Sequence, residues 1–276
     1  MDSHFHLDCY DDGNKDRILA RAWKAGLQIL VSVATSLANS AATYLQAKAW
    51  QGKIFTTVGV HPLEPSLPTN EPNKLATALE TFLETAPTPP IAVGETGLDC
   101  AKISSKNLRR EMEQQLVRLE PHIAVAKAAK LPLILHCRDR AGDDTAWNAL
   151  TGQLVRQRFP SEKALIHCFS YDSEKLRQWQ DFGGWVSFAG NLTWSSTIAA
   201  SCRGSAVERT LFETDAPYLL PEPLRSKDPG QSNEPANLVH TMAKAAELLS
   251  VSQTKVWEMS LANGRRFFSL GGAGNG

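Results

Sequence analysis

Short apolar runs alternate with longer amphipathic segments along almost the whole chain of 276 residues. Several of the apolar runs are continuous blocks rather than alternating patterns. Continuous apolar strands are typical of parallel sheets, whose strands are buried on both faces. The pattern predicts eight strands, at residues 1–5, 27–34, 54–60, 91–95, 132–136, 164–168, 184–188 and 210–214.

The segments between these runs have apolar residues at helical spacing. They predict helices at residues 15–25, 36–50, 73–85, 106–130, 144–157 and 173–182, a weaker one at 195–203, and two closing helices at 235–249 and 253–263. Eight strands that alternate with helices favour a single (β/α)8 TIM-type barrel. The main alternative, an open doubly wound sheet, usually has a Gly-rich phosphate loop after its first strand. Here the first strand leads into His-Leu-Asp-Cys-Tyr-Asp-Asp.

No internal repeat and no Ser/Gly linker divides the chain. We therefore expect one barrel over residues 1–268, followed by a Gly-rich flexible tail at 269–276. Residues 67–72 and 220–233 are rich in proline and polar residues. They predict surface loops, and the second is long enough to border a site.

Composition narrows the functional class only slightly. An apolar content of 42% supports a large core, and no run approaches the ~20 apolar residues that cross a bilayer. The N-terminus has no basic segment followed by an apolar one, so we expect a cytoplasmic protein, and no obligate protein partner is evident. The five cysteines are scattered without a Cys-x-x-Cys pair, which argues against a disulfide framework or a thiolate zinc site. Net charge is zero, but bound divalent ions would still let the protein bind a polyanion.

Six potential metal ligands stand at or just past the ends of predicted strands. In a barrel, the carboxyl ends of the strands form the rim where catalytic groups collect. Imidazoles and carboxylates that converge on one rim are the donor set of a hydrolytic metal site. The sequence therefore predicts a metal-dependent hydrolase with its metal site at the C-terminal rim. The six residues are His4, His6, Glu95, His136, His167 and Asp215.

The place of each residue on its predicted strand indicates metal binding more strongly than its residue type alone. His4 and His6 are two apart on a predicted strand, so their side chains point the same way and can share one ion. Glu95 ends an apolar run, where a carboxylate is a poor core residue unless it is paired or coordinates a metal. A strand-end salt bridge is the alternative for Glu95. His136 and His167 each end a buried run, one βα unit apart, whereas a lone core histidine is usually just hydrogen-bonded to backbone.

Further polar residues lie near the same predicted rim. Asp215 follows the last predicted strand directly. Glu213 is two residues before it, so its side chain should point to the same side of the strand, and we expect it to be an inward group that supports the ligands. His61 follows the third strand and faces the same rim, where it could contact substrate. Asp99 is expected in a turn after the fourth strand, capping or orienting that loop. His122 falls within a predicted helix and is interpreted as non-functional.

Taken together, the motifs resemble the TatD family of metal-dependent deoxyribonucleases, which are amidohydrolase-like barrels. The resemblance extends over residues 1 to about 268 in the family's motif order. Its motifs are Asp-Ser-His-Phe-His-Leu-Asp at 2–8, Gly-Val-His-Pro at 59–62, Gly-Glu-Thr-Gly-Leu-Asp at 94–99, Leu-His-Cys-Arg at 135–138, Ile-His-Cys-Phe at 166–169, Glu-Thr-Asp-Ala-Pro-Tyr at 213–218 and Asn-Glu-Pro at 233–235. Cys100 and Tyr171 depart from residues common in the family, but neither change removes a ligand.

The resemblance implies two divalent ions, with Mg²⁺, Mn²⁺ and Zn²⁺ as the candidates. One ion would be held by His4, His6, Glu95 and Asp215, and the other by Glu95, His136 and His167. A water activated between the ions would attack phosphorus, with Asp215 as its proton acceptor. His61 and Arg138 would position the phosphate, and His61 would help the leaving oxygen gain its proton. The implied substrate is DNA, as single strands or 3′ ends, and the implied reaction is 3′–5′ exonuclease cleavage.

Two other functions are compatible with parts of the pattern. A related barrel metallohydrolase could act on an amide, lactone or phosphoester with the same metals and the same activated water. Many such enzymes bridge their metals with a carboxylated lysine at a strand end, where this chain has Glu95. A non-catalytic binding module would have lost one or more ligands, and all six are present.

Overall fold

The computed structural model describes residues 1–64, 71–86 and 88–271. Its eight strands follow one another in the sheet in the order of the sequence, and β1–β2, β3–β4, β4–β5, β5–β6 and β7–β8 are parallel pairs. This is the topology of a (β/α)8 barrel and confirms the predicted fold class. The strands are β1 (Asp2–Phe5), β2 (Leu30–Ser32), β3 (Ile54–Val58), β4 (Ala92–Asp99), β5 (Leu133–Arg138), β6 (Ala164–Ile166), β7 (Trp185–Phe188) and β8 (Thr210–Phe212).

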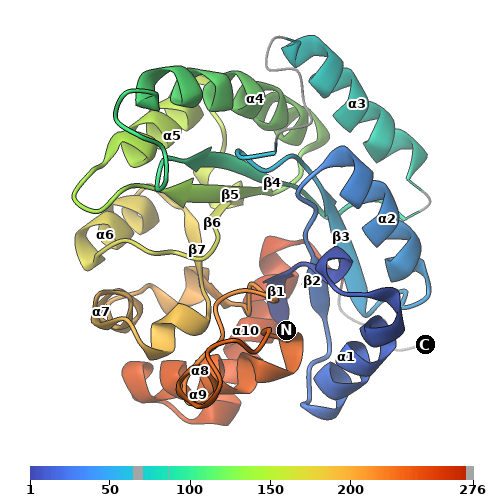
Figure 1. The fold of residues 1–276 in the computed structure, drawn as a ribbon, viewed down its shortest axis with the longest axis vertical. Helices are drawn as coiled ribbons and strands as arrows, with labels where there is room; N and C mark the ends of the chain where they lie inside the picture. Colours follow the sequence, from blue (N-terminus) through green and yellow to red (C-terminus); the bar gives the residue numbers. More distant parts are fainter. Residues whose placement is uncertain (65–70, 87, 272–276) are drawn as a thin grey trace. The chain divides into compact units, whose positions relative to one another are not determined.

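Helices alternate with these strands along the chain (Figure 1). Several begin at a residue whose side chain accepts a hydrogen bond from an N–H of the first turn, as Ser36, Asp172, Ser195 and Ser252 do. The helices are α1 (Asp12–Lys24), α2 (Leu37–Lys48), α3 (Pro72–Thr85), α4 (Leu108–Ala129), α5 (Thr145–Arg156), α6 (Ser173–Asp181), α7 (Ser196–Arg203), α8 (Leu224–Lys227), α9 (Leu238–Leu249) and α10 (Gln253–Phe267).

Short 3₁₀ turns complete the described elements: η1 (Leu7–Cys9), η2 (Ser161–Lys163), η3 (Gly190–Thr193), η4 (Val207–Arg209) and η5 (Pro235–Asn237). The segment 220–233, predicted as a loop, contains the four-residue helix α8. None of the helices in the described part of the chain has the length and apolar character needed to cross a membrane.

The chain forms two compact units. The first unit comprises Met1–Ser32, Trp50–Phe55 and Cys168–Gly276, and in it β1 pairs with β2 and β7 with β8. The second unit comprises Val33–Ala49 and Thr56–His167, and in it β4 pairs with β3 and β5, and β5 with β6. The single barrel domain over 1–268 stays a prediction. Part of the predicted loop (67–70) and of the predicted tail (272–276) lies outside the described residues.

Strand β4 continues four residues beyond Glu95, where the sequence predicted its end. Its continuation pairs with β5 from Thr96 to Asp99. Gly97 permits this pairing, because it has φ +143° and a Cβ there would lie 2.0 Å from the carbonyl oxygen of His136. As a result Asp99 is part of the sheet rather than of the predicted turn.

Candidate metal centre

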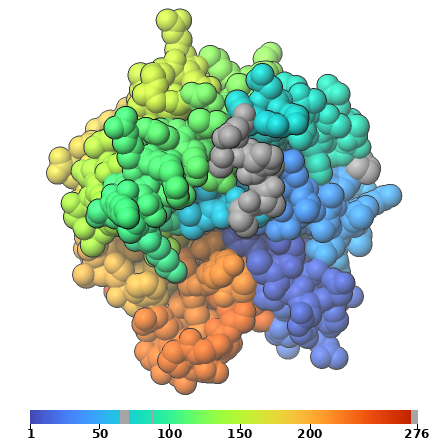
Figure 2. Space-filling model, turned by 45° about the horizontal axis from the view of Figure 1, so that its top comes forward, coloured from blue at the N-terminus to red at the C-terminus, as the bar shows by residue number. Residues whose placement is uncertain are grey.

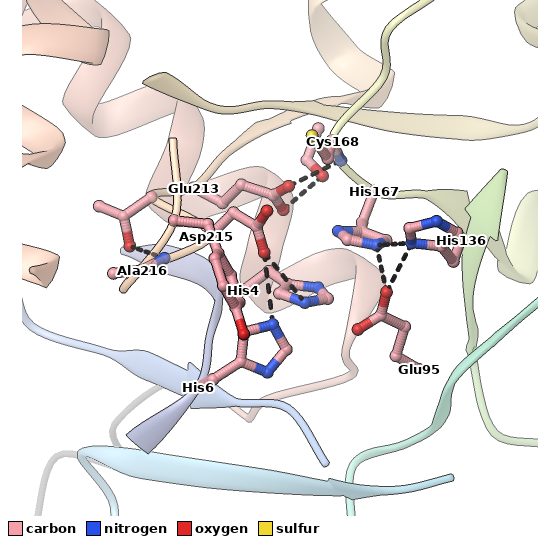
Figure 3. Close-up of polar contacts among 12 residues, drawn as sticks. His4, His6, Glu95, His136, His167, Cys168, Glu213, Asp215 and Ala216 are labelled. Atoms are coloured by element: carbon pink, nitrogen blue, oxygen red, sulfur yellow. Dashed lines mark hydrogen bonds and ion pairs between the residues drawn. The ribbon is translucent and has the colours of Figure 1, made fainter. Parts of the chain in front are cut away.

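The first unit brings together His4, His6 and Asp215, as the sequence predicted (Figure 3). Both imidazoles are buried; His4 lies on β1, and His6 follows it directly before η1. One carboxylate oxygen of Asp215 lies 3.3 Å from Nε2 of His6 and 3.7 Å from Nε2 of His4. One donor atom from each of the three side chains lies within 4.8 Å of the others. We call these three residues the first cluster.

Backbone contacts between β1 and the segment after β8 position the first cluster. The N–H of Asp215 donates to the carbonyl of His4 (3.0 Å), and the N–H of His6 donates to that of Ala216 (2.8 Å). Asp2 adds a buried carboxylate that accepts from the hydroxyl (2.6 Å) and the N–H (3.0 Å) of Thr214. Burial raises the pKa of Asp2 to about 7, although the Thr214 bonds oppose this change.

The second unit gathers a second cluster, which consists of Glu95, His61, His136 and His167. One oxygen of Glu95 lies 2.8 Å from Nδ1 of His136 and 2.8 Å from Nε2 of His167 (Figure 3). Nε2 of His61 is 3.6 Å from the same oxygen. Burial opposes ionisation, but the nearby His167 and His61 and the imidazole hydrogen bonds hold the pKa of Glu95 well below its usual range. Glu95 is therefore an anion available to a cation.

Asp99 borders this second cluster, although the sequence placed it in a turn. One of its oxygens lies 3.0 Å from Nε2 of His136, the ring nitrogen that does not face Glu95. Gln115 fixes the backbone of Asp99 by accepting from its N–H (2.8 Å) and donating to its carbonyl (3.0 Å). A carboxylate on the far nitrogen sets the tautomer and orientation of a metal-binding imidazole. The sequence signal was weak, because the apolar run of β4 ends before Asp99.

His61 is placed by backbone contacts just after β3. Its N–H donates to the carbonyl of Thr35 (2.9 Å), and its Nδ1 accepts from the N–H of Leu63 (3.1 Å). Burial lowers the pKa of His61 to about 4, against the attraction of Glu95. The neutral ring therefore has its proton on Nε2, the nitrogen that faces Glu95.

Two further residues support this region of the second unit. Buried His122 of α4 accepts from the N–H of Val60 (3.0 Å), the residue before His61. This structural role was not visible in the sequence, where His122 is only a polar residue in a helical pattern. Arg138, the last residue of β5, lies opposite Asp99 in the strand pairing, and its side chain is exposed.

Glu213 follows β8 directly and is fully buried, in agreement with the inward direction that its position two residues before Asp215 predicted. Its carboxylate accepts from the N–H of Cys168 (2.7 Å) and from the hydroxyl of Ser187 (2.5 Å). The predicted strand at 164–168 extends too far, because it includes Cys168. Strand β6 ends at Ile166, and Cys168 has a left-handed backbone conformation with φ +46°. Its amide turns toward Glu213 in this conformation.

Each cluster offers imidazole nitrogens and at least one carboxylate, in a largely buried setting. Mixed nitrogen and oxygen donors suit Zn²⁺ and Mn²⁺, and a carboxylate-containing set also accepts Mg²⁺. The residues present therefore fit a divalent cation in each unit.

The family model described as "TatD related DNase" matches residues 1–269. The chain belongs to this family. It is 30% identical to an "Uncharacterized metal-dependent hydrolase TatD" of Mycobacterium tuberculosis, over 98% of each chain. It is also 30% identical to a protein of Edwardsiella piscicida named "3'-5' ssDNA/RNA exonuclease TatD", over 94% of each chain. The activity class that these matches support is metal-dependent hydrolysis.

Solved structures support the fold. The crystal structure of YJJV, a TatD homologue from Escherichia coli, has a TM-score of 0.82 at 25% identity and covers 98% of each chain. A lactonase from Listeria monocytogenes has a TM-score of 0.70 at 14% identity, over 98% of this chain and 94% of its own. At that identity the likeness to the lactonase concerns the fold alone.

Proposed function

We propose that the protein hydrolyses phosphodiester bonds of single-stranded DNA and removes nucleotides from the 3′ end. The observation that carries the proposal is the pair of imidazole–carboxylate clusters, each with donor atoms close enough to hold a cation. Membership of the TatD family adds the substrate class, because the Edwardsiella relative is named as an exonuclease of single-stranded DNA and RNA.

We propose that His4, His6 and Asp215 hold one divalent ion and that Glu95, His136 and His167 hold another. Bound ions would stabilise negative charge on the phosphoryl oxygens and make water a better nucleophile at neutral pH.

Asp215 is proposed as the proton acceptor for the attacking water. Its side chain is 13% exposed, whereas the His4 and His6 side chains are 0% and 4% exposed, so solvent has better access to the carboxylate. The left-handed backbone of Asp215 (φ +51°) turns the chain at the end of β8, where this side chain meets the two imidazoles.

His61 and Arg138 are proposed to hold the phosphate. Because Leu63 donates to Nδ1 of His61, the neutral ring presents an N–H at Nε2 that can donate to a phosphoryl oxygen. This favours positioning of the phosphate over protonation of the leaving oxygen. Arg138 would add a charge-assisted contact, and its exposed side chain is free to reach a polyanion.

A comparison of linear with circular single-stranded DNA of the same sequence tests the proposal. The metal-loaded protein should shorten the linear strand progressively and leave the circle intact, because a circle has no 3′ end. Cleavage of the circle at a similar rate would indicate an endonuclease instead. Hydrolysis of a lactone, amide or phosphotriester with no action on either DNA would overturn the proposed substrate class.

A further inference from the structure

Tyr218 is a large aromatic residue kept at the surface directly beside the first cluster. It lies three residues after Asp215, and its side chain is 56% exposed. Its ring and the imidazole of His6 form a T-shaped contact, with centroids 5.9 Å apart and planes inclined at 70°. The segment that follows β8, in orange, lies on the face shown in Figure 2. The tyrosine thus contacts a candidate ligand and solvent at the same time.

Several contacts fix Tyr218 in this exposed position. Its N–H donates to the carbonyl of Asp215 (2.9 Å), and its own carbonyl accepts from the side-chain amide of Asn233 (2.7 Å). Its hydroxyl lies near the thiol of Cys9 in η1.

Asn233 connects this tyrosine to the first cluster. It is buried, and its amide also donates to the carbonyl of Thr214, the residue before Asp215 (3.1 Å). The backbone carbonyl of Asn233 accepts from the hydroxyl of Tyr10 (2.6 Å). The Asn-Glu-Pro motif therefore has a structural purpose, because its first residue holds the segment that contains both Asp215 and Tyr218.

A surface aromatic side chain held this firmly has already lost most of its conformational freedom. A partner that stacks on it therefore costs little additional side-chain entropy. Nucleobases are such partners, because every base has a π face and stacks on aromatic rings with little regard to sequence.

We propose that the exposed face of Tyr218 is a stacking platform for a nucleobase next to the phosphodiester that is cleaved. This inference rests on the proposed function and makes it more specific. It requires an unpaired base, so the platform favours single strands and frayed ends over fully paired ends. Because stacking is tolerant of base identity, the platform gives a preference for single strands rather than for a base sequence.

The test compares two substrates and four proteins. One substrate is a 5′-labelled oligonucleotide, and the other has abasic tetrahydrofuran residues at its last two 3′ positions. The proteins are the wild type, Tyr218→Ala, Tyr218→Phe, and Phe182→Ala as a control. Phe182 is also surface-exposed (41%), but it ends α6 and is no part of either cluster.

Tyr218→Ala should lower kcat/KM for the base-bearing substrate by about 5- to 150-fold, the range that loss of one stacked base implies. It should leave the abasic substrate within about twofold of the wild-type value. Tyr218→Phe keeps the ring and should match the wild type on both substrates, as should Phe182→Ala. An equal loss on the two substrates would overturn the platform and assign Tyr218 to the packing of His6.

Failure of the proposed function is seen separately. If the wild type cleaves neither oligonucleotide, the nuclease proposal fails, and binding of the same labelled strands to the metal-loaded protein is measured by fluorescence anisotropy. The wild type should then bind the base-bearing strand more tightly than the abasic one, and Tyr218→Ala should remove this difference. Equal wild-type affinity for both strands would overturn the platform whatever the cleavage result.

Discussion

His122 provides a prediction about stability that can be tested without any substrate. The residue is fully buried in α4, where Nε2 accepts from the N–H of Val60 and Nδ1 lies 2.7 Å from the carbonyl of Arg118. Burial lowers the pKa of His122 from 6.5 to about 4. The ring is therefore neutral in the folded protein, with its proton on Nδ1, at pH values where an unfolded chain would already be protonated.

The sign and size of the effect follow from this difference. Between pH 7 and pH 5 the unfolded chain gains a proton at this histidine and the folded protein does not, so the free energy of unfolding decreases as the pH falls. Folded and unfolded pKa values of about 4 and 6.5 correspond to a loss of about 2 kcal/mol from pH 7 to pH 5. The penalty is nearly absent above pH 7 and fully developed below pH 4.

The test uses His122→Gln, whose side-chain oxygen can still accept from Val60 but does not titrate. Urea unfolding of the wild type and the variant is measured at pH 7 and pH 5, with EDTA present. The wild-type advantage in the free energy of unfolding should shrink by about 2 kcal/mol at the lower pH. His240→Gln is the control, because the partly buried His240 should give a smaller change in the same direction. A wild-type advantage that does not change with pH would refute the reasoning.

Three further predictions concern residues of strand β4. Glu95→Ala should abolish turnover and greatly weaken metal binding, while the circular dichroism spectrum stays native. Glu258→Ala, at an exposed position, is the control. A fully active Glu95 variant would contradict the two-metal proposal. Asp99→Asn should weaken metal binding by about 10- to 100-fold in a chelator competition, because His136 loses its orienting carboxylate, and unchanged affinity would exclude that role. Gly97→Ala should lower the free energy of unfolding by at least about 2 kcal/mol, because its Cβ would meet β5. Gly13→Ala has open space in α1 and should raise the free energy of unfolding by up to about 1 kcal/mol, because alanine is the better helix former. Equal effects would contradict the close approach of the strands.

The apolar pattern was sufficient to predict the eight strands and most of the helices. Parallel strands buried on both faces need continuous apolar runs, so their positions can be read directly from the sequence. A polar residue at or just past the end of such a run is then a candidate for the catalytic groups that gather at the carboxyl ends of the strands. This is why the six candidate ligands were predicted to converge, whereas their division between two ions was implied only by the resemblance to the TatD family.

Contacts that depend on backbone geometry were not predictable in this way. The continuation of β4 to Asp99 requires the positive φ of Gly97 and close packing on β5, and neither leaves a hydrophobic signal. The left-handed turn at Cys168 exposes its amide to Glu213 only after β6 has ended. His122 contacts Val60 across a long sequence separation, so its role needed the three-dimensional arrangement.

The most direct test of the central claim is cleavage of a 5′-labelled single-stranded DNA oligonucleotide by protein stripped with EDTA, before and after Mg²⁺, Mn²⁺ or Zn²⁺ is restored. The account predicts an intact strand without metal and, with at least one of these ions, a ladder that shortens from the 3′ end. Stoichiometric metal binding with an intact strand would contradict the nuclease assignment, and cleavage in EDTA would contradict its dependence on metal.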